Sequence, residues 1–124
     1  MIYGIGTDIL KISNIEQSVT DIDDPFVRKV YTFKELKLIQ SKPTPLFSFA
    51  TRFCGKEAVF KCLNIDGNSI RLNEIEILEH TNGCPFVNLH GAANKISKET
   101  GISRILISLS YDTDYATAYA IAEI

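Results

Sequence analysis

Apolar residues alternate with polar ones, or run together for a few positions, in five stretches of the chain, and this pattern predicts five β-strands. The expected strands are residues 2–10, 74–80, 85–90, 102–111 and 115–123. Asn82-Gly83 is a hairpin signal and should join the second strand to the third. Asp112-Thr113-Asp114 should form the turn between the last two strands. These short connections favour antiparallel pairing.

Other stretches carry the spacing and end signals of α-helices. Thr32-Phe33-Lys34-Glu35 is a capping-box pattern that starts a helix, which should stop before Pro43. Gly101 is placed to end the last helix in a left-handed conformation. The segment 21–25, which contains three aspartates and ends in Pro25, is expected to form a turn after a short first helix. The remaining expected helices are residues 12–20, 46–63, the strongest candidate, and 91–100.

The main elements follow the order β-α-α-β-β-α-β-β, which predicts an α+β fold with a mainly antiparallel sheet packed against helices. The chain has 124 residues, the size of one ordinary domain. No linker rich in Pro, Gly or Ser divides it and no repeat is visible. We therefore expect a single domain over residues 1–124.

Composition excludes several classes of protein. Hydrophobic residues make up 45% and charged residues 23%, so a disordered chain is not expected. No apolar run approaches the roughly 20 residues of a membrane span, and the start lacks the features of a signal peptide. Three cysteines without metal-ligand spacing fit reduced thiols and a cytoplasmic location. A net charge of −2 argues against a nucleic-acid binder.

The charge is unevenly placed. Residues 28–71 contain nine Lys or Arg and three Asp or Glu, whereas both flanking segments are acidic. A basic middle between acidic ends suggests a localised anionic ligand. The alternative is that solvated faces happen to segregate by charge.

Glu57 stands out in the 46–63 helix because it falls within the apolar arc of that helix. A buried carboxylate needs a counter-charge or a metal ion. Lys61, four residues later, could supply an ordinary helical ion pair. Arg52, Lys56 and Lys61 lie along the edges of the helix, where they could hold phosphates or only solvate the outer face.

Gly4, Gly6 and Asp8 share one face of the first expected strand. The two missing side chains leave room for a backbone or a ligand to approach closely. Asp8 could instead cap the following turn. Taken with Glu57, Asp8 offers the oxygen ligands that Mg²⁺ prefers when it shares phosphate oxygens. This combination fits phosphoryl-type transfer from a polyphosphate donor.

Three motifs carry a family resemblance. Residues 4–9 read Gly-Ile-Gly-Thr-Asp-Ile, residues 52–61 contain Arg-Phe-x-x-Lys-Glu-Ala-x-x-Lys, and residues 108–110 read Ser-Leu-Ser. Together they closely resemble the holo-(acyl-carrier-protein) synthases, the short bacterial-type 4′-phosphopantetheinyl transferases. The resemblance extends over nearly the whole chain. It implies the phosphopantetheinyl transferase fold and transfer of the phosphopantetheine arm of coenzyme A to a serine of apo acyl carrier protein.

The resemblance also implies roles for particular residues. Asp8 and Glu57 match the Mg²⁺ ligands, and with Lys61 they form the expected catalytic set. Glu57 or a metal-bound water would take the serine proton, and Lys61 would stabilise charge on the leaving phosphate. The residues expected to contact coenzyme A are Arg52, Lys56, Lys61, Ser110 and Tyr111. Short members of the family assemble as trimers with active sites between protomers, so a homotrimer is expected.

The sequence departs from the family pattern in three places. Tyr111 follows Ser-Leu-Ser where relatives usually carry histidine, and residues 64–67 replace a common Gly-Thr-Gly loop. The first helix is basic in many relatives and docks the acidic carrier protein, but here it offers acids, so docking through it would meet like charge: Glu16, Asp21, Asp23 and Asp24. Four bases could take over docking: Arg28, Lys29, Lys34 and Lys37. These departures keep open an alternative, a non-catalytic relative that only binds coenzyme A or a carrier protein.

Overall fold

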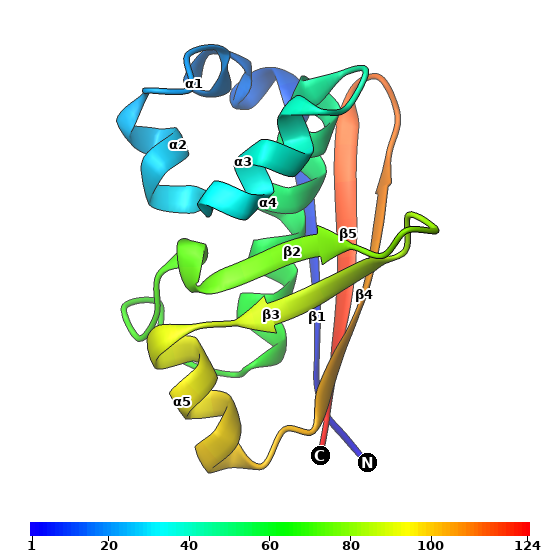
Figure 1. Ribbon diagram of the computed structural model, residues 1–124. Helices are drawn as coiled ribbons and strands as arrows, with labels where there is room; N and C mark the ends of the chain where they lie inside the picture. The colour runs from blue at the N-terminus through cyan, green and yellow to red at the C-terminus, as the bar shows by residue number, and fades with distance from the viewer.

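A computed structural model describes residues 1–124 and shows a long helix between two antiparallel sheets (Figure 1). The larger sheet has the strand order β1-β5-β4 and is formed by β1 (Ile2–Lys11), β5 (Tyr115–Glu123) and β4 (Arg104–Tyr111). The smaller sheet pairs β2 (Ile75–Glu79) with β3 (Pro85–Leu89). The long helix, α4 (Pro45–Cys62), contacts strands of both sheets.

Shorter helices complete the fold. Figure 1 shows α1, α2 and α3 gathered beside the first half of α4, with α5 at the opposite end next to β3. Their bounds are α1 Glu16–Thr20, α2 Pro25–Val30, α3 Phe33–Gln40 and α5 Gly91–Thr100, with 3₁₀ turns at Ile12–Asn14 and Leu72–Glu74. None of these helices, nor α4, is long and apolar enough to cross a membrane.

Small residues let α4 lie close to the larger sheet. Ala116, Ala118, Ala120 and Ala122 alternate along β5 and are all buried. On the neighbouring strand, a Cβ at Gly4 would stand 2.2 Å from the carbonyl oxygen of Cys62. The backbones of β1 and α4 are therefore in direct contact, which explains the glycines that the sequence places on one face of this strand.

Gly6→Ala should destabilise the protein by about 3 kcal/mol, because overpacked interiors lose roughly this much. A Cβ at Gly6 would lie 2.0 Å from the carbonyl oxygen of Ala58, so strand and helix would have to separate. Urea denaturation measures the change. Gly67→Ala is the matched control, since no atom lies within 4 Å of its added Cβ, and it should change stability by less than about 1 kcal/mol. Equal effects of the two substitutions would contradict the close contact.

The α+β class, the antiparallel pairing and the main elements are as the sequence predicts. The segment 12–20 differs, since it divides into a 3₁₀ turn and the short α1. The helix α2 was not predicted, because Asp24 and Pro25 resemble a turn. In the structure Asp24 caps α2 by accepting a hydrogen bond from the Phe26 amide at 2.8 Å, and Pro25 occupies the first turn. Pro favours that position because its missing N–H has no partner in a helix start.

Candidate active site

Asp8, Glu57 and Lys61 meet where β1 crosses the second half of α4. The Lys61 ammonium nitrogen lies 2.9 Å from the carbonyl oxygen of Thr7 and 3.3 Å from Asp8 Oδ1. Half of the Lys61 side chain is exposed, whereas the Asp8 side chain is mostly covered. Glu57 is partly buried, and both Asp8 and Lys61 are near enough to shift its pKa.

The packing of β1 on α4 explains how these residues meet. Gly4 faces the turn at Cys62, and Gly6 faces the preceding turn at Ala58. Two residues of a strand span about 6.6 Å, and one turn of a helix spans about 5.4 Å. Every second residue of β1 therefore lies beside a successive turn of α4. Asp8 therefore comes near Cys54, one further turn back, and its charge helps to raise the pKa of the Cys54 thiol. Glu57 follows Cys54 by three residues and so lies on the same side of α4.

The pKa values reflect this crowding. Burial raises the pKa of Glu57 above its usual value, the negative charge of Asp8 raises it further, and Lys61 opposes the shift. Burial, followed by the effect of Asp8, raises the pKa of the Cys54 thiol to about 12. Cys54 is therefore a protonated, structural thiol at neutral pH, and it donates to the Ala116 carbonyl at 3.3 Å.

The donor set fits a divalent cation that is shared with a substrate. Two carboxylates and one ammonium leave a net negative charge at this place when all are ionised. No group of three or more His, Cys, Asp or Glu residues is arranged to hold a metal ion by itself. Mg²⁺ commonly binds through one or two carboxylates together with water and phosphate oxygens. Asp8 and Glu57 match this mode better than a closed metal cage.

Arg52 lies in a second charged group, on the side of α4 that faces β2. Its guanidinium is buried and lies 3.3 Å from Glu79, which also binds Lys42. The Arg52 Nε is buried without a hydrogen-bond partner. Lys42 and Arg52 therefore share the single carboxylate of Glu79, which leaves one positive charge unbalanced. A bound anion would balance this charge.

Comparisons with known proteins agree with this geometry. A model of the 4′-phosphopantetheinyl transferase superfamily matches residues 4–120. The chain belongs to this superfamily. It is 38% identical to the holo-(acyl-carrier-protein) synthase of Caldicellulosiruptor saccharolyticus over 99% of this chain and 98% of that protein. The corresponding enzyme of Halothermothrix orenii is 34% identical with the same coverage.

Solved structures show the same fold. The crystal structure of the Neisseria meningitidis holo-(acyl-carrier-protein) synthase has a TM-score of 0.88 and 32% identity, with full coverage of both chains. The Helicobacter pylori synthase in complex with coenzyme A has a TM-score of 0.82 and 26% identity, covering 96% of this chain and 99% of that one. The predicted phosphopantetheinyl transferase fold and activity are thus confirmed. Nothing in these comparisons supports the non-catalytic alternative.

Lys56 requires a correction within this phosphopantetheinyl transferase, because it was expected to contact coenzyme A. Its side chain is 0% exposed, and its ammonium nitrogen lies 2.6 Å from Glu35 Oε1. The same nitrogen donates to the carbonyl oxygens of Leu72 and Ile75. All three N–H groups of the ammonium are therefore used inside the protein. Lys56 ties α4 to α3 and β2 and has no group left for a phosphate.

Ser110 and Tyr111 of the transferase lie away from the Asp8 cluster of their own chain. Ser110 is exposed, and its neighbour Leu109 in β4 is the one that points toward α4. Ser110 therefore faces the opposite side of the sheet from Asp8. Tyr111 stacks on Phe47, with ring centroids 4.9 Å apart. Phe47 precedes Glu57 by ten residues, or about 15 Å of helix.

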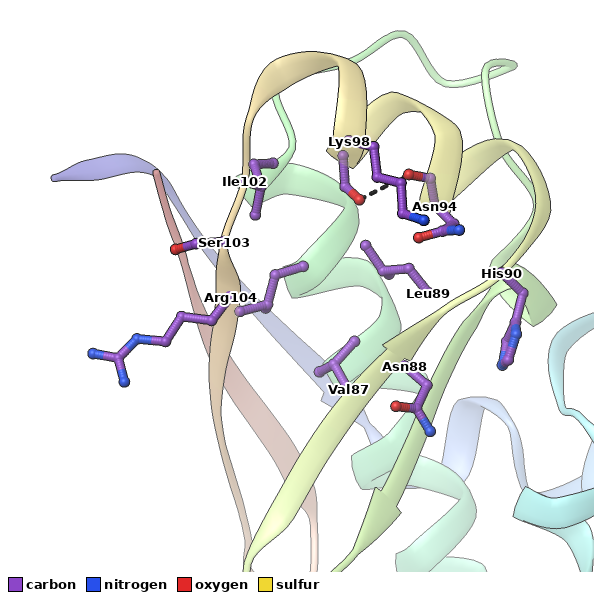
Figure 2. Close-up of a pocket in the computed structure, with 11 residues that line it drawn as sticks. Val87, Asn88, Leu89, His90, Asn94, Lys98, Ile102, Ser103 and Arg104 are labelled. Atoms are coloured by element: carbon purple, nitrogen blue, oxygen red, sulfur yellow. Dashed lines mark hydrogen bonds between the residues drawn. The ribbon is translucent and has the colours of Figure 1, made fainter.

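Figure 2 shows a groove that is distinct from the candidate active site. It has a volume of about 460 Å³ and lies between β3, α5 and the start of β4. None of the predicted site residues lines it. Arg104 points away from the groove in Figure 2 and pairs with Glu123. We assign no ligand to this groove.

Sequence reasoning missed the acidic partners of these bases. Glu35 was predicted only as a helix-capping residue, and Glu79 was given no role of its own. In the structure Glu35 also binds Lys56, and Glu79 binds Lys42 and Arg52. A carboxylate in a capping box can accept further hydrogen bonds, which is the only signal the sequence offers.

Proposed function

We propose that the chain transfers the 4′-phosphopantetheine group from coenzyme A to a serine of apo acyl carrier protein and releases adenosine 3′,5′-bisphosphate. The observation that carries this proposal is the meeting of Asp8 and Glu57 beside Lys61, across β1 and α4. Relatives over nearly the full chain are named holo-(acyl-carrier-protein) synthases, and the Helicobacter pylori structure is a coenzyme A complex.

Asp8 and Glu57 are the proposed ligands of Mg²⁺. When bound, this ion supplies positive charge and Lewis acidity to the phosphate oxygens. Lys61, held by Asp8 and the Thr7 carbonyl, is placed to bind the same phosphates. Arg52 is the proposed contact for a further phosphate of coenzyme A, because it shares the single carboxylate of Glu79 with Lys42.

Glu57 is the proposed base for the serine hydroxyl. Its carboxylate is partly buried beside Asp8, where the phosphates of coenzyme A are proposed to bind. In the transfer, the serine oxygen forms a bond to phosphorus, the bond from phosphorus to the bisphosphate oxygen breaks, and the serine proton moves to Glu57. Lys61 stabilises the negative charge that develops on the departing bisphosphate.

A homotrimer is part of the proposal, and the outer face of the larger sheet supports it. On this face Ile5 is 70%, Ile9 66% and Tyr119 61% exposed. Apolar side chains exposed in this number commonly mark a subunit interface. Ser110 and Tyr111 then become proposed coenzyme A contacts for a neighbouring protomer, since they are distant from Asp8 in their own chain. The free thiols Cys54, Cys62 and Cys84 support the proposed cytoplasmic location.

Incubation of apo acyl carrier protein with coenzyme A, Mg²⁺ and the enzyme should add the mass of phosphopantetheine to the carrier protein. Removal of the metal with EDTA should abolish the mass gain, because Asp8 and Glu57 alone repel the phosphates. Excess Mg²⁺ should restore it. Mass spectrometry of the intact carrier protein provides the measurement. Tight binding of coenzyme A without any mass gain would refute the proposed transfer and favour the non-catalytic alternative.

A further inference from the structure

Lys56 and Lys61 lie on the same helix but are held in different ways. Lys56 is 0% exposed, and all three of its N–H groups have partners inside the protein. The Lys61 ammonium has two partners, the Thr7 carbonyl at 2.9 Å and Asp8 Oδ1 at 3.3 Å, and half of its side chain is exposed. One of its N–H groups is therefore left for solvent or a ligand. Lys61 can also leave Asp8 at small cost, because ion pairs at the surface contribute little to stability.

Asp8 and Glu57 share the positive charge of Lys61. Asp8 accepts the Lys61 ammonium directly. Burial and the charge of Asp8 raise the pKa of Glu57, and the charge of Lys61 opposes both effects. One ammonium thus offsets part of the negative charge of two carboxylates. Positive charges repel each other strongly at such short distances, so Lys61 on Asp8 weakens the binding of a divalent cation to this pair of acids.

We propose that Lys61 competes with the divalent cation for Asp8 and leaves this carboxylate for the phosphates of coenzyme A when the cation is bound. This inference rests on the proposed function, because Asp8 and Glu57 are the proposed metal ligands. The half-exposed side chain and the free N–H group of Lys61 permit the exchange of partners. Lys56, enclosed on all sides, could not make it.

The exchange couples the binding of the metal to the binding of coenzyme A. With coenzyme A present, the phosphates replace Asp8 as the partner of Lys61, so less is lost when the metal binds. The metal should therefore bind more tightly to the enzyme with coenzyme A than to the enzyme alone, and linkage requires the same factor for coenzyme A. Direct contacts between metal and phosphate give coupling of the same sign. The affinity of the enzyme for the metal alone therefore identifies the part played by Lys61.

The first measurement is metal binding without coenzyme A. Mn²⁺ titration followed by electron paramagnetic resonance gives the Kd of the wild type and of Lys61→Met, which removes the charge but keeps a long side chain. Lys61→Met should bind Mn²⁺ about tenfold more tightly, because the competing charge is gone. Lys61→Arg keeps the charge and should not bind Mn²⁺ more tightly than the wild type. Lys95→Met, on the exposed side of α5, is the matched control and should change the Kd less than about twofold.

The second measurement is the binding of coenzyme A at saturating Mn²⁺, followed by isothermal titration calorimetry. Lys61→Met should bind coenzyme A about tenfold more weakly, because the phosphates lose a charged hydrogen-bond donor. Tighter binding of Mn²⁺ alone together with weaker binding of coenzyme A is the expected result. An unchanged or weaker affinity of Lys61→Met for Mn²⁺ would overturn the competition. Equal tightening by Lys95→Met would also overturn it, since the effect would then reflect only the net charge of the protein.

The proposed function would fail in a different way. If Asp8→Asn leaves the Kd for Mn²⁺ unchanged, the proposed metal site is wrong and the competition falls with it. If Asp8→Asn weakens Mn²⁺ binding but Lys61→Met does not strengthen it, the metal site stands and only the competition is wrong. If Lys61→Met shows both expected shifts but the wild type never modifies the carrier protein, the proposed transfer alone is refuted.

Discussion

Asp8→Asn and Glu57→Gln should each lower the rate of phosphopantetheine transfer about a thousandfold or more, because charge stabilisation by a metal ion is worth several kcal/mol. Both substitutions keep the shape and one oxygen of the side chain but remove a negative charge from the place where β1 meets α4. Loss of either charge should also weaken the binding of a divalent cation. Intact-mass assays measure transfer, and Mn²⁺ titration followed by electron paramagnetic resonance measures the metal.

The folded state should tolerate Glu57→Gln. Burial and Asp8 raise the pKa of Glu57, so ionisation of this carboxyl opposes folding. At a pH below the pKa that Glu57 has in the unfolded chain, Glu57 is protonated in both the folded and the unfolded state, and its ionisation costs no stability. The full loss of stability is reached once the pH exceeds the raised pKa of Glu57 in the folded state. At neutral pH without metal, Glu57→Gln should therefore keep or raise the melting temperature. Loss of function with retained stability is typical of a functional residue.

Glu99→Gln is the matched control, since Glu99 is exposed on α5 and makes no ion pair. Its transfer rate should stay within about twofold of the wild type, as surface substitutions usually have small effects. Full activity of either Asp8→Asn or Glu57→Gln would remove that residue from the proposed site. A large drop in melting temperature for Glu57→Gln would show that the carboxylate has a structural role instead.

The meeting of Asp8 and Glu57 could be anticipated from the sequence because two local signals are unusual. Two glycines preceding an aspartate on one strand face permit direct backbone contact, and a glutamate in an apolar helical arc needs a partner. Which strand packs on which helix is not a local property. The contact of Gly6 with Ala58 joins residues far apart in the chain, and only the tertiary fold brings them together.

The surroundings of Lys56 and Arg52 could not be predicted from the sequence of α4 alone. Both were placed on the edges of α4 by helical periodicity, which describes one helix in isolation. In the fold, α3 and β2 cover that edge and supply Glu35 and Glu79. A lysine covered on all sides by neighbouring elements cannot be told from a solvated one by spacing alone. Ser110 is a different case, since the sheet turns it to the face opposite Asp8, and its contact with coenzyme A stays a prediction for a neighbouring protomer.

Lys56→Met should destabilise the folded protein by about 3–5 kcal/mol, because it leaves a buried carboxylate without its counter-charge. Glu35 and Lys56 are both 0% exposed and lie 2.6 Å apart. Burial lowers the pKa of Lys56, and the charge of Glu35 opposes that shift, so Lys56 depends on Glu35 to remain ionised. Urea denaturation at one fixed protein concentration measures the loss, since oligomerisation would otherwise change the apparent stability.

A double-mutant cycle separates the pair from the rest of its surroundings. Glu35 also accepts hydrogen bonds from the amides of Thr32 and Ile77, so Glu35→Leu has a cost of its own. Glu35→Leu/Lys56→Met should nevertheless cost about 1–3 kcal/mol less than the sum of the single substitutions, because no charge is left buried alone. Arg28→Met, which breaks an exposed pair with Asp23, is the control and should cost less than about 1 kcal/mol. Additive losses in the Glu35 and Lys56 cycle would mean that the two groups do not stabilise each other, and Lys56 would again be available for a ligand.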